Sequence, residues 1–249
     1  MRNVKTLALL FVFLFPVYAA IAQANYVAST IIQLNGDTLN GEIDYREWVY
    51  NPKTINFRAN KNKKSQVYTP NEIKGFTILS KNEKYQSAIV KVNNESLDSE
   101  HPKMSVYDSK DSLDNKYIAW ETDTVFLSVI AQGRLSLFEL SYYVDSKAHY
   151  FIQKGDGKIE ELIYRRVKLH NHDTLGFIKI HTYRMQLHYL MIDYMAKPNI
   201  TLLPYAKSRI LKLVRQYNEA AGQSFFIVKD RKSPKHLSIM AGMMQPRHI

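Results

Sequence analysis

The sequence predicts an α+β fold that is mostly antiparallel β and carries a pair of helices near its C-terminal end. Before residue 166, runs of alternating apolar and polar residues recur between glycine or asparagine turns, as in β-hairpins. These runs fall into two blocks, each suited to a small barrel or a sandwich. After residue 186 the apolar residues change to the helical period.

The first β domain is expected to cover residues 23–92. Residues 26–34 are rich in β-branched side chains and precede Asn35-Gly36, a typical hairpin dipeptide because both positions tolerate a positive φ. The strand that follows alternates, with Ile43 on its apolar side and Asp44 on its polar side. Further strands are expected over residues 54–58, 73–79 and 84–92.

A polar segment separates the two blocks. Residues 93–116 contain six Asp or Glu residues and few large apolar ones, which predicts a long loop or linker. The second domain, residues 117–229, then begins with two glycine-turn hairpins. Their strands are expected over residues 124–131 and 134–144, and over residues 148–153 and 158–165.

Two helices are expected to complete the second domain. The first has Leu187, Leu190, Met191 and Tyr194 at i, i+3, i+4 and i+7, and Pro198 ends the pattern. The second follows Pro204 and is closed by Gly222 as its C-cap. Its other face is basic, and we expect the helix to pack on the protein's own core rather than on a membrane. Its apolar stripe consists of Ile210, Leu213, Val214, Tyr217 and Ala221.

The N-terminus is typical of a secretory signal peptide, residues 1–22. Arg2 and Lys5 give a positive start, residues 7–17 are apolar, and Ala20-Ile21-Ala22 fits a cleavage site. An exported protein is therefore expected, in the periplasm or at the outer-membrane surface. Elsewhere in the sequence the apolar runs are too short for a transmembrane helix.

Composition excludes several function classes. The chain has no cysteine, so disulfides, thiol catalysis and cysteine-type metal sites are excluded. Its formal net charge is +11. In an exported protein this charge meets anionic headgroups or polysaccharide, and without a nucleic-acid motif we expect no nucleic-acid partner. No cofactor is expected either, since Gly155-Asp156-Gly157 is followed by no Gly-Lys-Ser/Thr and by no helix, as a phosphate loop requires.

His170 and His172 are the candidates for a metal site. On an extended strand they share one face, with Asp173 nearby, and zinc accepts this set of ligands. Their spacing matches no established ligand motif. We therefore favour the other interpretation, that they are turn and surface histidines, and predict no metal.

Two pairs of carboxylates were considered for catalysis. Glu42 and Asp44 share a strand face about 6–7 Å apart, a separation found in inverting glycoside hydrolases. Carboxylates on the polar face of a strand are more commonly solvated. Glu160 and Glu161 are adjacent, so on a strand they face opposite sides and cannot act together. No catalytic residue is predicted.

Several short stretches together suggest a family. They are residues 36–46 (GDTLNGEIDYR), 51–52, 55–57, 73–76, 132–137 and 149–154, with the helical region 187–218. This set resembles the N-terminal, pre-barrel region of uncharacterised exported outer-membrane-associated proteins of Bacteroidota. The resemblance spans most of residues 26–229 and includes no catalytic motif.

The resemblance implies a protein of the cell envelope. In many of these relatives the region precedes an outer-membrane β-barrel. In the tail, residues 230–249, the stretch 237–244 suits a first barrel strand. A minimal barrel takes eight strands of about ten residues each, so we expect no barrel within this sequence.

We therefore expect a non-enzymatic binding or structural module associated with the outer membrane. Its contacts with cell-envelope components would use exposed strand edges, tyrosines or basic side chains. One alternative is an envelope polysaccharide hydrolase, which requires a shielded carboxylate pair in a cleft. The other is a metal-binding periplasmic protein, which requires His170 and His172.

Overall fold

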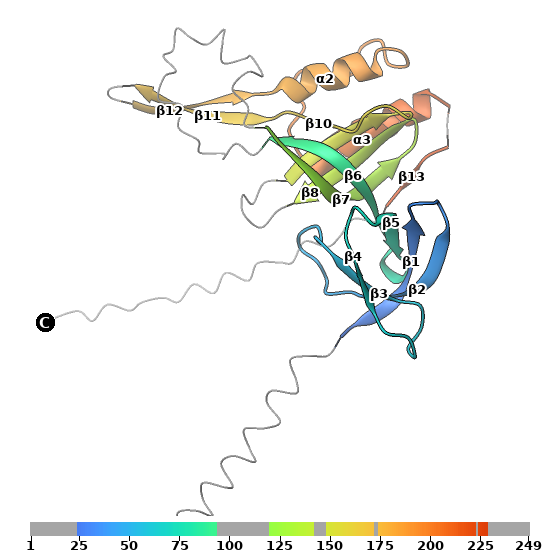
Figure 1. Cartoon of the computed structure of the whole chain (residues 1–249). Helices are drawn as coiled ribbons and strands as arrows, with labels where there is room; N and C mark the ends of the chain where they lie inside the picture. The colour runs from blue at the N-terminus through green and yellow to red at the C-terminus, as the bar shows by residue number, and fades with distance from the viewer. Residues whose placement is uncertain (1–23, 94–119, 142–147, 172–173, 223, 229–249) are drawn as a thin grey trace, which may run out of the picture.

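The computed structural model describes residues 24–93, 120–141, 148–171, 174–222 and 224–228, with side chains of residues 167–177 left out. The predicted signal peptide, most of the predicted linker and the predicted tail lie outside these ranges. Within them the fold is α+β and mostly antiparallel β, as the sequence predicts. One large sheet, a separate hairpin and two α-helices make up most of the described part of the chain (Figure 1).

The large sheet is open. Its strands follow the order β10-β9-β8-β7-β6-β5-β1-β2-β3-β4, so within the described residues β10 and β4 are its two ends. The N-terminal strands are β1 (Tyr26–Gln33), β2 (Thr38–Asp44), β3 (Ile55–Arg58), β4 (Gln66–Tyr68), β5 (Ile73–Ile78) and β6 (Glu83–Asn93). The later ones are β7 (Trp120–Gln132), β8 (Leu135–Ser141), β9 (Ala148–Lys154), β10 (Glu160–Glu161) and β13 (Phe226–Ile227).

The first hairpin forms where Asn35-Gly36 predicts it, with a longer turn than that dipeptide favours. Gly36 donates its N–H to the Gln33 carbonyl at 2.9 Å, and Gln33 donates to the Asp37 carbonyl at 2.8 Å. Gly36 alone takes a positive φ, +98°, whereas Asn35 uses its side chain to accept the Asp37 N–H at 2.9 Å. The turn is therefore a three-residue loop closed by a left-handed glycine.

Strands β6 and β7 join the two predicted β blocks directly. They pair antiparallel from Tyr85 opposite Ser128 to Asn93 opposite Trp120. The predicted linker connects the ends of this pair, and its own structure lies mostly outside the described residues. The predicted domain division stays a prediction, but the strands on either side of it share one sheet.

The helices cover one face of β7–β10. Helix α2 (Thr182–Met191) follows a protruding hairpin of β11 (Arg165–Asn171) and β12 (Thr174–Ile180), and α3 (Lys207–Ala220) follows α2 (Figure 1). In α3 the predicted stripe is buried, from Ile210 to Tyr217, and Gly222 has the positive φ of a C-cap. Asn218 fixes α3 to β8: its side chain accepts the Leu135 N–H and donates to the Leu135 carbonyl, both at 2.9 Å.

Three apolar clusters stabilise this arrangement. One lies between β7–β10 and the two helices, and includes Leu137, Leu187 and Val214. A second lies on the opposite face of β6–β9 and includes Val92 and Phe138. Strands β8 and β9 are thus buried on both faces, because the sheet coils until β10 contacts β6. The third cluster fills the N-terminal strands.

Some local features differ from the sequence prediction. Helix α2 ends at Met191, so Tyr194 lies in the turn after it and the helix ends well before Pro198. Strand β10 has two residues, where eight were expected over residues 158–165. Asp44 is buried rather than solvated, because it accepts the Asn25 N–H at 3.0 Å at the start of β1.

Candidate functional site

A buried polar junction lies where the coiled sheet brings β10 back to β6. Glu161 of β10 and His149 of β9 have side chains only 1% exposed, and His149 Nδ1 is 2.7 Å from Glu161 Oε1. The backbone N–H of Asn93, the last residue of β6, donates to Glu161 Oε2. One carboxylate therefore connects three strands of the sheet.

Helix α2 is bonded to the same place. Gln186 donates from Nε2 to the backbone carbonyl of Glu161 at 2.9 Å, and its Oε1 accepts the Ile163 N–H at 2.9 Å. A buried carboxylate requires hydrogen-bond partners, and this one has them. The junction is closed to solvent, so its hydrogen bonds hold the strands and α2 together and do not form a site that receives a substrate.

An aromatic cluster lies between this junction and the helices. The Tyr164 and Tyr205 rings stack at 5.0 Å, and Tyr183 packs edge-on against Tyr205 at 5.0 Å. The Tyr205 hydroxyl donates to the Leu162 carbonyl at 2.9 Å and accepts the Tyr150 N–H at 3.2 Å. Burial raises the pKa of Tyr205 well above its usual value, so this hydroxyl stays protonated and serves to hold backbone.

His181 lies at the edge of this cluster. Its ring is 5.4 Å from that of Tyr164 and 5.8 Å from that of Tyr183. Among the described residues its buried Nδ1 has no hydrogen-bond partner. Burial, and then the positive charges of Arg184 and Lys179, lower the pKa of His181. The imidazole is therefore neutral at ordinary pH.

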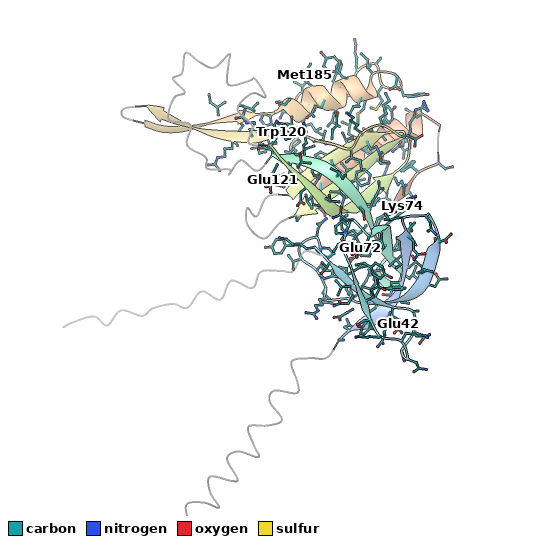
Figure 2. The ribbon with its side chains drawn as sticks, viewed as in Figure 1. Glu42, Glu72, Lys74, Trp120, Glu121 and Met185 are labelled. Atoms are coloured by element: carbon teal, nitrogen blue, oxygen red, sulfur yellow. The ribbon has the colours of Figure 1, made fainter. Side chains whose placement is uncertain are left out.

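The outward side of α2 is the surface where exposed apolar side chains gather. Met185, Tyr189 and Ile192 follow i, i+4 and i+7 spacing, and their exposed fractions are 52%, 69% and 53%. Figure 2 shows Met185 on the side of α2 that faces away from the sheet. Leu202, 82% exposed, lies beside the first turn of α2, because Arg184 donates to the carbonyls on either side of it. We call these four residues the α2 outer face.

The segment that carries the α2 outer face is basic. Residues 165–215 contain ten Lys or Arg and two Asp, a net charge of +8 out of +11 for the whole chain. Helix α3 packs on the same face of the sheet as α2 and keeps Arg209 and Arg215 exposed. Lys179 before α2 and Lys197 after it are exposed as well. Apolar and cationic groups thus share one side of the molecule.

The structure describes the sequence-predicted metal candidates only in part. The backbone of His170 pairs with Leu175 in the β11–β12 hairpin, but its side chain and the whole of His172 lie outside the described residues. Among the residues that the structure describes, no group of three or more His, Asp or Glu residues could hold a metal ion.

The two carboxylates considered for hydrolysis are each paired with an arginine. Glu42 Oε2 is 2.7 Å from the guanidinium of Arg58, and Asp44 Oδ2 is 3.1 Å from that of Arg46. Figure 2 places Glu42 at the opposite end of the molecule from α2. An acid and a base acting on one bond would need to face a common cleft, whereas these groups neutralise separate cations.

Sequence reasoning found the relation of Glu160 to Glu161 and missed the partner of Glu161. Glu160 is exposed and Glu161 is buried, as adjacent positions on a strand require. His149 and Asn93 could not be recognised, because one is 12 residues and the other 68 residues away in the chain. The sequence held one indication that Glu161 needs a buried partner: this charged residue directly precedes Leu162, which is buried.

None of the helices in the described residues is both long and apolar enough to cross a membrane. Comparison of the chain with protein-family models, with curated proteins and with solved structures gives no match in any of the three.

Proposed function

We propose that this is an exported, non-enzymatic binding module of the cell envelope, associated with the outer membrane, and that it binds through the α2 outer face. The observation that carries the proposal is the combination described above: Met185, Tyr189, Ile192 and Leu202 are exposed on a basic part of the chain. Exposed apolar groups of this kind, bordered by polar ones, mark interaction surfaces.

The polar groups inside the sheet support binding rather than catalysis. Glu161 and His149 are closed off from solvent, and the Tyr205 hydroxyl bonds two backbone groups. A catalytic group has to reach its substrate, whereas these groups hold strands and helices in place. Gln186 bonds α2 to the backbone of Glu161 and Ile163, which suits a preformed binding surface.

Site-specific photo-crosslinking in intact cells tests this proposal. A photoreactive phenylalanine analogue replaces Tyr189 on α2 or, as the matched control, Ile89 on β6, which is 73% exposed. We expect the protein in the envelope fraction, with its first 22 residues removed, and adducts at position 189 but not at position 89. Retention in the cytoplasm, or equal labelling at both positions, would overturn the proposal.

A further inference from the structure

We propose that the α2 outer face docks on the surface of a bilayer that contains anionic lipid. The inference rests on the proposed function and names the partner of the same surface. Apolar side chains would enter the boundary between headgroups and acyl chains, and the surrounding lysines and arginines would bind lipid phosphates.

The side chains of α2 are those of an interfacial helix. Its inward residues Tyr183, Leu187 and Met191 are fully buried against the sheet, so the helix is already fixed in the fold. Its outward residues are nevertheless apolar again, with Tyr189 the most exposed residue of the helix. Tyrosine favours the membrane–water boundary, because its ring is apolar and its hydroxyl is polar.

The charge around the α2 outer face selects an anionic partner. Lys179 and Lys197 are exposed on either side of α2, and Arg209 and Arg215 are exposed on α3, whereas Arg165 of the same segment is buried. Asp193, which follows α2, is 2.9 Å from Lys154 Nζ and thus already paired. Each basic residue close to an anionic bilayer contributes about 1 kcal/mol of attraction.

The same charge argues against a second copy of this chain as the occupant. Two identical surfaces that each expose Lys179, Lys197, Arg209 and Arg215 would repel one another, because like charges facing across an interface cost several kcal/mol. Shape argues in the same direction. Helix α2 is the outermost element on its side of the molecule (Figure 1), and a protruding helix suits a planar surface.

Flotation with vesicles tests the inference. The protein is recovered from the envelope fraction, and its intact mass is checked for removal of the N-terminal segment. It is then mixed with vesicles of phosphatidylcholine alone or of phosphatidylcholine with phosphatidylglycerol. We expect at least about tenfold stronger partitioning onto the vesicles that contain phosphatidylglycerol, and weaker partitioning at high salt.

Two pairs of variants separate the α2 outer face from the rest of the protein. The triple variant Met185→Gln, Tyr189→Ser, Ile192→Gln should lower partitioning at least about tenfold, whereas Ile89→Gln, equally apolar and exposed on β6, should not. Lys197→Glu should also weaken it, unlike Lys74→Glu on β5 (Figure 2). Each altered side chain is exposed, and an unchanged thermal midpoint verifies folding of each variant.

The inference is overturned if the native protein does not float with vesicles that contain phosphatidylglycerol, or if the triple variant floats equally well. Photo-crosslinking then decides the proposed function separately. If the adducts specific to position 189 contain protein or polysaccharide, the proposed binding function is supported and lipid is rejected as the partner. Loss of both flotation and crosslinking would reject both.

Discussion

Replacement of Asn218 by alanine tests most directly how the helices are held on the sheet. Asn218 has no exposed surface, and its carboxamide bonds both backbone groups of Leu135, itself fully buried. Asn218→Ala removes a partner from the Leu135 N–H and from the Leu135 carbonyl together. A buried group left without its partner costs about 1–3 kcal/mol, so the variant should lose roughly 2–6 kcal/mol of unfolding free energy.

The assay is urea unfolding followed by circular dichroism. We expect a lower midpoint for Asn218→Ala at an unchanged slope, since a lost contact changes stability without changing the surface exposed on unfolding. Asn199→Ala is the control, because Asn199 is exposed in the segment between α2 and α3 and should cost at most about 0.5 kcal/mol.

A loss below about 1 kcal/mol for Asn218→Ala would refute the reasoning. Such a result would mean that water or a neighbouring group replaces the carboxamide, and that apolar packing alone holds α3 on β8. It would also weaken the case for a preformed α2 outer face, because both helices pack into the same apolar cluster.

Three further results are expected. Glu161→Ala removes a buried acceptor from two partners and should cost about 3–5 kcal/mol in urea unfolding, whereas Glu160→Ala should stay within about 0.5 kcal/mol; equal losses would contradict the buried junction. The lowered pKa of His181, caused first by burial, means that the unfolded chain binds this proton more readily. The unfolding free energy should therefore fall as pH drops below 6.5 and should level off below the folded-state pKa, and His181→Gln should make the profile of unfolding free energy against pH flatter; an unaltered profile would contradict this. Gly75→Ala would place a Cβ 2.4 Å from the backbone oxygen of Tyr85 on β6, so calorimetry should show a lower thermal midpoint, and an unchanged one would exclude this close strand approach.

Local patterns were sufficient to predict most of the strands and both helices. β-Branched runs, alternation and glycine turns predicted β1–β3 and β5–β9, and the apolar stripe from Ile210 to Tyr217 predicted the buried side of α3. These features depend on residues at most a few positions apart, because strand and helix periods are local. Boundaries were less accurate: Tyr194 fits the α2 stripe by spacing yet lies in the turn after the helix.

Glycine at position 133 shows how a correct local prediction can have a non-local cause. The sequence predicts a turn at Gln132-Gly133 between two strands, and β7 and β8 do join there. The structure adds that a Cβ on Gly133 would lie 2.8 Å from the Phe225 Cβ and 3.0 Å from the Asn218 carboxamide. The glycine therefore also makes room for the side chain that fixes α3.

The sequence by itself determined most of the secondary structure, the absence of cysteine chemistry and the basic charge, since each is a property of composition or of neighbouring residues. Only the tertiary structure decided that β6 and β7 pair, that Glu161 is joined to His149 and Asn93, and that one apolar side of α2 remains uncovered. The helical period of α2 cannot distinguish its covered side from its exposed one, because apolar residues occur on both. That distinction depends on which side the sheet covers, and the coiling of distant strands sets it.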